Sequence, residues 1–474
     1  MADTHEYDVV CIGGGIAGLV TAARAAELGL KVAVLERGAE DAYPCNSRYS
    51  GGVMHISYKD PANPKEELVR AINEITDGYA APELVDAITG HCKRGLEWLQ
   101  QQGARFMRID PGMQRSDIGS RAWILAPVRP PVTQLEWKGR GADVTLRALE
   151  AGLLKRGGKM FRGTEATALV MDNGRCTGVA ASQAGTPVTF KAGAVVISDG
   201  GFQGNPDIVR QHIAPAPDKV KQRGAGTGRG DGLRMAREVG AEITPLDGFY
   251  GHILSLDAMQ NDRLWPYPQL DLVAAAGLLV NRAGCRIADE GLGGVYMANI
   301  MARQADPQAC FAIFDEVIWQ DSGRAAAVAP NPNLEKHGGA LFKADSIAGL
   351  ARALGVDVAG LEKTVADYNA ALAAGTLGQL TPARSTKRRK AEAIAKAPFY
   401  GAPASTGITY TMGGIRTDAS ARVLRPDRTP ITGLYAAGAT TGGLEGGPCV
   451  GYVGGLMKGI VFGLLAAESI AGRQ

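Results

Sequence analysis

The sequence predicts an α/β fold in which a layered domain with a parallel sheet is interrupted by an inserted segment. A glycine-rich turn joins a strand to a helix near the N-terminus, and short strands follow at residues 164–198. A glycine-rich, strand-like region returns after Phe399, whereas the chain between 246 and 395 holds more aromatic residues and long helical stretches. We therefore expect a first domain part at 1–245, an insertion at 246–395 and a second domain part at 396–474.

The first unit of this domain is a strand, a glycine turn, a helix, a second strand and an acid. These pieces lie at residues 7–12, 13–18 (GGGIAG), 19–28, 31–35 and Glu36. Such an order is typical of a dinucleotide-binding unit. Gly13 allows the tight turn, Gly15 lets the backbone approach a pyrophosphate, and Gly18 lets the helix pack closely on the strand. The helix N-terminus offers N–H groups to phosphates, and the Glu36 carboxylate can accept hydrogen bonds from ribose hydroxyls.

The later elements follow from the spacing of apolar residues. Helices are expected at 82–101, 144–154, 233–239 and 347–374, and strands of a second sheet at 164–171, 176–182, 187–191 and 194–198. The chain has one GxGxxG motif, which argues against a second dinucleotide-binding domain. Residues 433–438 (GLYAAG) instead predict a strand and a turn that return to the same cofactor.

The composition argues against several classes of protein. The 474 residues carry a net charge of +3, so nothing indicates a nucleic-acid partner, and the basic run at 384–390 is expected to be a solvated face. The seven cysteines are scattered without a CxxC pair, which argues against a disulfide scaffold, an iron–sulfur cluster or a cysteine zinc site. The chain shows neither a signal peptide nor an apolar stretch long enough to span a bilayer, so we expect a cytoplasmic protein with no membrane span.

Segments along nearly the whole chain resemble the fumarate reductase/succinate dehydrogenase flavoprotein family. They are 13–18 (GGGIAG), 46–52 (NSRYSGG), 198–205 (SDGGFQGN), 226–232 (GTGRGDG), 278–290 (LLVNRAGCRIADE), 409–415 (TYTMGGI) and 433–438 (GLYAAG). The resemblance implies a Rossmann-type FAD-binding domain with an inserted α+β capping domain, and FAD held at their interface. Cys45 lies near the position where some relatives attach FAD covalently through a histidine, and we expect noncovalent FAD here.

The resemblance also implies which residues meet FAD. Ala166 would meet the adenine end through its backbone, Asp231 would contact the cofactor, and Gly455 and Leu456 would offer backbone N–H groups to the flavin ring. Such donors stabilise the negative charge that develops on the reduced flavin. The full expected set is Gly13, Gly15, Ile16, Ala17, Gly18, Glu36, Arg37, Asn46, Ser47, Ser50, Gly51, Gly52, Ala166, Asp231, Gly438, Gly455 and Leu456.

The departures from the family concern the substrate and one FAD contact. Fumarate reductases carry a proton-donating arginine four residues after the glutamate that matches Glu290, whereas this chain has Gly294. Tyr410 replaces a histidine, and residues 448–452 (PCVGY) stand where an arginine would clamp a carboxylate. Ala439 replaces the acid that usually follows the GLYAAG segment. Because a C4 dicarboxylate needs cationic partners, we expect a poor fumarate reductase.

Two tyrosines offer a different chemistry. The positions of Tyr296 and Tyr452 resemble those of active-site tyrosines in 3-ketosteroid dehydrogenases, a branch of the same family. There one tyrosine moves a proton and another polarises the substrate carbonyl, and we assign these roles to Tyr296 and Tyr452 in that order. A core tyrosine with a satisfied hydroxyl is the alternative for each. His252 and Tyr410 are further catalytic candidates.

These observations lead to an FAD-dependent oxidoreductase as the main hypothesis. It would desaturate or reduce a CH–CH bond next to a carbonyl or carboxyl group of a small organic substrate, with the direction and the electron donor or acceptor left open. One alternative is a carboxylate dehydrogenase or reductase of the tricarballylate or fumarate kind, with Arg121, Arg129, Arg223 or Arg229 as the clamp. Others are a flavoprotein subunit that passes electrons to a protein partner and a flavin monooxygenase.

Overall fold

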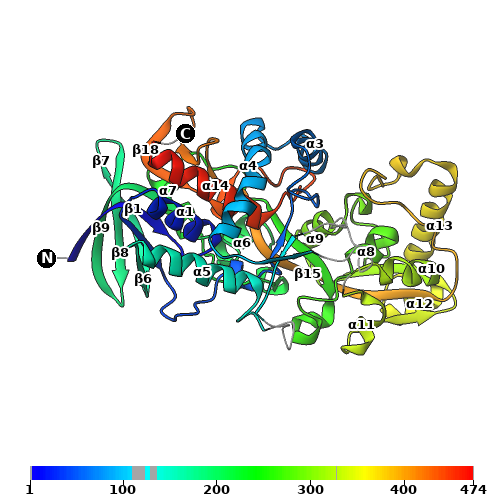
Figure 1. The fold of residues 1–474 in the computed structure, drawn as a ribbon. Coiled ribbons are helices and arrows are strands. Elements are labelled where there is room, and N and C mark those ends of the chain that lie inside the picture. The colour runs from blue at the N-terminus through cyan, green and yellow to red at the C-terminus, as the bar shows by residue number, and fades with distance from the viewer. Residues whose placement is uncertain (1–2, 109–122, 129–135, 327, 473–474) are drawn as a thin grey trace.

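The structure is a computed structural model and describes residues 3–108, 123–128, 136–326 and 328–472. Two large sheets organise these residues, one toward each end of the molecule in Figure 1. The first sheet combines strands from the N-terminal and C-terminal parts of the chain. The second draws most of its strands from the middle of the chain.

The first sheet has the strand order β17-β18-β9-β1-β2-β6. Its strands are β1 (Asp3–Ile12), β2 (Val32–Glu36), β6 (Lys159–Arg162), β9 (Thr186–Ile197), β17 (Arg422–Leu424) and β18 (Pro430–Ala436). β1 pairs in parallel with β2 and β9, and β18 pairs in parallel with β9. An antiparallel extension, β7 (Thr164–Asp172) and β8 (Arg175–Gln183), continues from β9. A strand from the C-terminal part thus joins the sheet that begins at the N-terminus.

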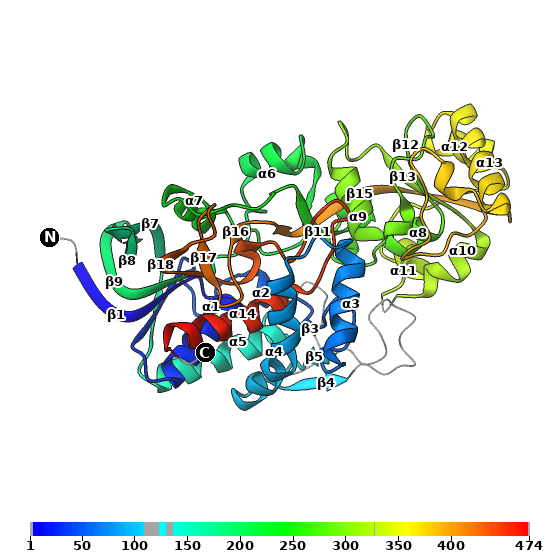
Figure 2. The same cartoon turned by 90° about the horizontal axis from the view of Figure 1, so that it is seen from above.

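Helices pack against one face of this sheet. The largest are α1 (Ile16–Glu27), α4 (Pro82–Gln101), α5 (Gly141–Lys155) and α14 (Gly455–Ile470), which group together in Figure 2. α1 approaches β1 so closely that a Cβ atom on Gly18 would lie 2.0 Å from the Gly13 carbonyl oxygen, so the position requires glycine. α14 packs on α1 through small residues, since a Cβ on Gly463 would lie 2.9 Å from the Ala17 carbonyl oxygen.

The second sheet is built around β15 (Phe399–Met412). Its other strands are β10 (Lys221–Gln222), β11 (Gly248–Ser255), β12 (Leu278–Asn281), β13 (Cys310–Asp315) and β14 (Phe342–Ala344). β13 runs antiparallel to the first half of β15, and β11 runs antiparallel to its second half. β15 lies beyond residue 395, and Figure 1 shows it as an orange strand between the two regions. β15 therefore belongs to the second sheet although it follows residue 395, where we expected the inserted segment to end.

Helices and short strands complete the described chain. Those around the second sheet are α8 (Asp271–Ala276), α9 (Gly294–Ala302), α10 (Glu316–Gln320), α11 (Pro330–Lys336), α12 (Ile347–Leu354) and α13 (Val358–Ala374). The others are α2 (Asn46–Tyr49), α3 (Lys65–Thr76), α6 (Pro206–His212), α7 (Asp231–Glu238), β3 (Val53–Met54), β4 (Phe106–Arg108), β5 (Trp123–Leu125), β16 (Ile415–Arg416) and β19 (Thr441–Gly442). Across the ranges that the structure describes, every helix is too short or too polar to traverse a lipid bilayer.

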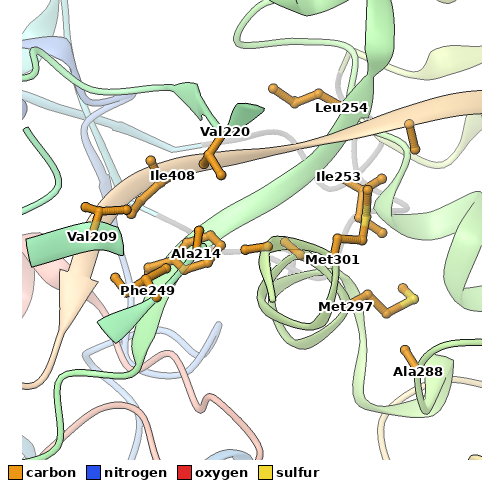
Figure 3. Close-up of a cluster of buried hydrophobic side chains, with 14 of the residues drawn as sticks. Val209, Ala214, Val220, Phe249, Ile253, Leu254, Ala288, Met297, Met301 and Ile408 are labelled. Carbon is orange, nitrogen blue, oxygen red and sulfur yellow. The ribbon is translucent and has the colours of Figure 1, made fainter. Parts of the chain in front are cut away.

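A shared hydrophobic core joins β11, β15 and α9. Figure 3 shows Phe249 and Ile253 of β11, Ile408 of β15, and Met297 and Met301 of α9 within one buried cluster. Because β11 and α9 are fixed by this core, the polar residues that alternate with Phe249 and Ile253 along β11 are held in place on its other side.

Four local predictions were wrong. The strands expected to form a second sheet at 164–198 are β7, β8 and β9, and they belong to the first sheet because β9 pairs with β1. The strands expected at 187–191 and 194–198 are one continuous strand, β9, because β1 pairs with it from Val188 to Ile197 across the expected break. The helix expected over 347–374 is broken into α12 and α13 at Gly355, which adopts a left-handed conformation with φ +67°. In the basic run, Arg384 is buried rather than solvated, and its guanidinium donates to the Ala275 and Lys390 carbonyl oxygens.

Candidate active site

The glycine turn between β1 and α1 forms the centre of the candidate dinucleotide site. Gly13 has φ +99°, which an L side chain rarely adopts, and α1 begins three residues later. The Glu36 carboxylate at the end of β2 accepts hydrogen bonds from the Gly14 N–H (2.8 Å) and the Gly38 N–H (2.7 Å). Burial raises the pKa of Glu36, and these two donors oppose that rise. Each carboxylate oxygen retains a lone pair for a ribose hydroxyl.

Buried polar atoms without partners lie on the neighbouring segments. Among the described residues, Arg37 Nη1, Asp199 Oδ1 and Gln203 Oε1 are buried and make no hydrogen bond. Burial also raises the pKa of Asp199 to about 6, although its other oxygen accepts from the Gly232 N–H at 2.7 Å. Native proteins rarely leave such atoms unsatisfied. Hydroxyls and phosphates of a dinucleotide would satisfy them, so these residues fit FAD.

Several expected FAD residues contact one another around this turn. The Ser47 hydroxyl oxygen accepts the Ile16 N–H at 3.0 Å, so the first turn of α1 meets α2. Asn46 donates to the Thr409 carbonyl oxygen (2.8 Å) and accepts the Ala225 N–H (2.8 Å). Asn46 therefore ties β15 to the 224–232 loop beside the turn.

The remaining expected FAD residues lie at five other places along the chain. Ser50 donates to the Ser47 carbonyl oxygen and leads to Gly51 and Gly52, the latter with φ +73°. Gly438 follows β18 and lies against Ala17, because a Cβ there would be 2.9 Å from the Ala17 Cβ. The other members lie in β7, at the start of α7 and at the start of α14, and they are Ala166, Asp231 (paired with Arg37), Gly455 and Leu456.

Cys45 precedes α2, and its thiol bears on whether FAD is attached covalently. Burial raises the pKa of Cys45 to about 12. A protonated thiol is a weak nucleophile, which favours the expected noncovalent FAD.

A cluster of aromatic rings lies where β11 and β15 of the second sheet meet the loop before α14. The rings of Tyr250 and Tyr452 stack at a centroid distance of 3.9 Å and an angle of 19°, and Tyr410 lies at 5.6 Å from Tyr250. His55 and Tyr58 contact Tyr452 edge-on at 5.1 and 5.7 Å. We call Tyr58, Tyr250, Tyr410 and Tyr452 the tyrosine cluster. Sequence reasoning identified two of its members, Tyr410 and Tyr452.

Tyr250 begins a chain of polar contacts that sequence reasoning missed. Its hydroxyl lies 2.9 Å from His252 Nε2, and His252 Nδ1 contacts the Asp271 carboxylate. Because a carboxylate only accepts, His252 carries its proton on Nδ1 and accepts the Tyr250 hydroxyl at Nε2. Asp271 is held in turn by the Ile253 N–H at 2.8 Å. The i, i+2 spacing of Tyr250 and His252 in a strand was the one sequence signal for their contact.

Gly294 explains why Asp271 can stand where it does. A Cβ on Gly294 would lie 2.1 Å from the Asp271 carboxyl carbon. An arginine at position 294, as in fumarate reductases, would therefore overlap the carboxylate. The structure replaces the expected cation with a phenol, an imidazole and a carboxylate.

Tyr410 is engaged by a second buried network. Its hydroxyl lies 3.0 and 3.1 Å from the two oxygens of Glu445. Glu445 Oε1 also accepts the Val453 and Gly454 N–H groups at 3.0 Å each. Lys458 Nζ donates to Glu445 at 3.2 Å. Burial and the neighbouring Glu445 charge raise the pKa of Tyr410 well above its usual value. Nothing in the sequence around Glu445 or Lys458 indicated this pairing.

Tyr296 lies in the first turn of α9 and packs against the tyrosine cluster. Its side chain is half-buried, and its hydroxyl makes no hydrogen bond to the described part of the chain. Burial raises the pKa of Tyr296, with the charges of Asp289 and Cys449 adding to the effect. A base would need the opposite shift, whereas a phenol with a raised pKa keeps its proton and can donate a hydrogen bond.

The arginines considered as carboxylate clamps are placed as follows. Arg223 is buried, and its guanidinium donates to the Thr409 hydroxyl (2.7 Å) and the Pro266 carbonyl oxygen (3.4 Å). Arg229 is exposed. Arg121 and Arg129 lie outside the described residues. Of the candidates that the structure describes, Arg223 is therefore the buried one.

The fold and this site define a flavoprotein class: a discontinuous dinucleotide-binding sheet with an acid at the end of β2 and a second sheet beside it. The profile of the FAD binding domain family matches residues 8–449, and the chain belongs to that family. It is an FAD-dependent oxidoreductase that acts on CH–CH groups of small molecules.

Curated relatives and solved structures are consistent with this class. The chain is 27% identical to a vinyl phenol reductase of Lactiplantibacillus plantarum, over 95% of both chains. It is 28% identical to an NADH:acrylate oxidoreductase of Vibrio harveyi over 82% of this chain, but it spans only 37% of that protein. A 3-ketosteroid delta1-dehydrogenase from Sterolibacterium denitrificans shares the fold with a TM-score of 0.71 at 20% identity, over 99% of this chain and all of that one. Fumarate reductases are also among the matches.

Proposed function

We propose that the protein desaturates or reduces a carbon–carbon bond next to a neutral carbonyl group. The observation that carries this proposal is the tyrosine cluster, in which phenol groups surround the region where fumarate reductases place cations. Tyr410 is engaged by Glu445, and Arg223 already donates to Thr409 and Pro266. Phenols donate single hydrogen bonds suited to a ketone or aldehyde oxygen, whereas a dicarboxylate requires bidentate cationic partners.

The residues of this chain divide the work of the proposed reaction. When bound, FAD supplies the two-electron oxidation or reduction. Tyr296 and Tyr452 supply carbonyl binding and proton transfer between them. Burial raises the pKa of Tyr452 well above its usual value, so at neutral pH its hydroxyl remains a donor. The surrounding rings exclude water from the carbonyl, which strengthens these hydrogen bonds.

A substrate panel tests the proposal. The holoenzyme is reduced without oxygen by reduced methyl viologen, and reoxidation of its flavin absorbance is followed with 2-cyclohexen-1-one, acrylate or fumarate. We expect the neutral enone to reoxidise the flavin at least tenfold faster than either carboxylate. Faster reoxidation by the carboxylates would contradict the preference for a neutral carbonyl.

Conservative variants test the two phenols. Tyr296→Phe and Tyr452→Phe remove only a hydroxyl and should leave FAD content unchanged. Each should lower turnover of the preferred substrate by about two to four powers of ten. Near-normal turnover in both variants would move the proton-transfer role to His252 or Tyr410.

A carboxylate substrate is the second candidate, and one observation favours it. The Nε of Arg223 is buried and makes no hydrogen bond to the described residues. Burial raises the pKa of Tyr250, and the Arg223 charge is near enough to oppose that rise. An incoming carboxylate would satisfy Nε. This candidate predicts that Arg223→Met abolishes acrylate-dependent reoxidation while sparing 2-cyclohexen-1-one.

The source of electrons lies outside the described site. One relative is an NADH:acrylate oxidoreductase and another is a fumarate reductase (cytochrome). We therefore propose either a nicotinamide or a protein partner as the physiological electron donor or acceptor. Anaerobic mixing with NADH separates them, because direct bleaching of the flavin supports the nicotinamide. We also propose that the protein is cytoplasmic. Fractionation of the native host cells tests this location.

A further inference from the structure

Tyr250 contacts Tyr452 as well as His252. The rings of Tyr452 and Tyr250 stack at a centroid distance of 3.9 Å and an angle of 19°, so the two tyrosines are in direct contact. The Tyr250 hydroxyl lies 2.9 Å from His252 Nε2, and the far nitrogen of that ring contacts Asp271. Four side chains from β11, α8 and the loop before α14 therefore form one contiguous group: polar contacts join Tyr250, His252 and Asp271, and ring stacking joins Tyr452 to Tyr250.

We propose that Tyr452, Tyr250 and His252 form a proton relay, anchored by Asp271, that takes up one proton from the substrate carbon beside the carbonyl. The proposal rests on the proposed function. It assigns proton transfer to Tyr452 and leaves carbonyl binding to Tyr296, because a chain of acceptors stands behind Tyr452. The Tyr296 hydroxyl has no such partner in the described part of the chain.

Each step of the relay breaks and forms one bond to hydrogen. The substrate C–H bond breaks, its electron pair stays on the substrate and delocalises into the carbonyl, and the proton goes to the Tyr452 oxygen. The former Tyr452 proton moves to the Tyr250 oxygen, and the former Tyr250 proton moves to His252 Nε2. Imidazolium beside the Asp271 carboxylate is the end state. Reduction of a double bond runs the same transfers in reverse.

The burial of the two phenols explains why the relay must reach a histidine. Burial raises the pKa of both Tyr250 and Tyr452, so a phenolate on either is costly. Imidazolium next to a carboxylate is a charge pair with a hydrogen bond, which is much less costly to bury than a lone phenolate. The proton therefore passes through the tyrosines and rests on His252.

Isosteric variants can remove the acceptor without disturbing the packing. In Asp271→Asn the side-chain amide donates to His252 Nδ1, which places the ring proton on Nε2 and turns the acceptor for Tyr250 into a donor. Its remaining oxygen still accepts the Ile253 N–H. Gly294→Ala is a second variant, because its methyl group would lie 2.1 Å from the Asp271 carboxyl carbon and displace the carboxylate.

The control is another buried phenol that contacts a carboxylate. Tyr400 lies near the start of β15 and donates to Glu316 at 2.6 Å. Tyr400→Phe removes a hydroxyl of the same kind at a site that the relay does not include.

The test uses 4-fluorophenol, whose fluorine chemical shift reports whether its hydroxyl is ionised, bound to the oxidised holoenzyme at pH 7. We expect the bound probe to be mostly phenolate in the wild type and in Tyr400→Phe, since the relay accepts its proton. The ionised fraction should fall at least fivefold in Asp271→Asn, in Gly294→Ala and in Tyr250→Phe, at equal FAD content.

Three outcomes would overturn the relay: a probe that fails to bind the wild type, a bound probe that stays neutral, or an ionised fraction unchanged in Asp271→Asn. No turnover occurs in this measurement, so a failed substrate panel leaves its result intact. Conversely, turnover of the enone with a neutral bound probe would reject the relay and keep the proposed function.

Discussion

At position 294, a single missing side chain decides which charged groups the active site holds. Gly294 leaves the space that the Asp271 carboxylate occupies, since a Cβ there would lie 2.1 Å from its carboxyl carbon. Asp271 in turn orients His252, which meets Tyr250. One glycine thus separates a site based on a cation from one based on a phenol and an imidazole.

This geometry predicts that restoring the arginine does not restore fumarate reduction. The wild type should reduce fumarate slowly, because a positioned proton donor contributes about two to four powers of ten. Gly294→Arg should gain no fumarate activity, since the new side chain collides with Asp271. Fumarate-dependent flavin reoxidation measures both proteins. A rate in Gly294→Arg that rises tenfold or more would show that Asp271 yields to the arginine.

A second prediction at the scale of residues concerns Asp199 and pH. Burial raises the pKa of Asp199 to about 6 in the folded protein, despite the nearby Arg37 charge, and Asp231 adds to the rise. The unfolded chain ionises this group near pH 4. Stability conferred by the protonated form is therefore complete below pH 4 and is lost as the pH rises through 6, a cost of about 2–3 kcal/mol at neutral pH.

Asp199→Asn should remove that cost in protein stripped of FAD. The variant's gain in free energy of unfolding over the wild type should grow from near zero at pH 4 to about 2–3 kcal/mol at pH 7, measured by urea unfolding. His55, whose pKa burial lowers to about 4, changes stability in the opposite direction but equally in both proteins. Asp207→Asn, an exposed site, is the control and should show no gain. A gain independent of pH would contradict the assignment.

At the scale of elements, Glu445 organises the loop that carries Tyr452. Its carboxylate accepts two backbone N–H groups just before α14 begins, and it pairs with Lys458 inside that helix. The loop and the helix are thus fixed relative to each other by one buried carboxylate. Tyr410 adds the strand β15 to the same group.

Breaking this buried pair from one side should be severe. Glu445→Gln leaves the Lys458 charge buried without a counter-ion, and we expect a loss of about 3–5 kcal/mol in the free energy of unfolding. The double variant Glu445→Gln/Lys458→Met removes both charges and should recover at least half of that loss. Urea unfolding of the wild type, Glu445→Gln, Lys458→Met and the double variant gives the coupling energy. Additive losses would show that the two side chains do not stabilise one another.

At the scale of the whole molecule, the segment after α13 ties distant parts of the chain together. Arg388 donates to the carbonyl oxygens of Leu292 beside α9, Cys449 in the loop before α14, and Ile75 in α3. Burial lowers the pKa of Arg388, yet an arginine remains charged at neutral pH. One guanidinium therefore joins the region around the second sheet to helix α3 and to the loop before α14.

Removing this guanidinium should loosen the three segments together. In Arg388→Met we expect backbone amide hydrogen exchange to quicken severalfold at 72–79, 290–295 and 446–452, because their shared cation is gone. The neighbouring Lys387, which makes an ion pair with Asp77 at the surface, provides the control variant Lys387→Met. Faster exchange confined to residue 388 and its neighbours would show that Arg388 does not link these segments.

The sequence by itself determined the local units of this protein. The strand, glycine turn and helix near the N-terminus, the acid Glu36 and helix α4 were predicted because each depends on neighbouring residues and on a short period. The family profile confirms the FAD-binding class, and the long-range return of β18 to the first sheet follows the glycine-rich pattern after Phe399.

Only the tertiary structure decided the chemistry of the candidate site. Tyr250, Asp271 and Glu445 belong to three different segments of the chain, and no periodicity records that Asp271 meets His252 or that Glu445 meets Tyr410. The burial of Arg384 could not be predicted either. An arginine can be buried only where the fold brings carbonyl groups to its guanidinium, and the basic run itself does not contain that information. Such contacts depend on how packed elements place side chains, which local propensity does not contain.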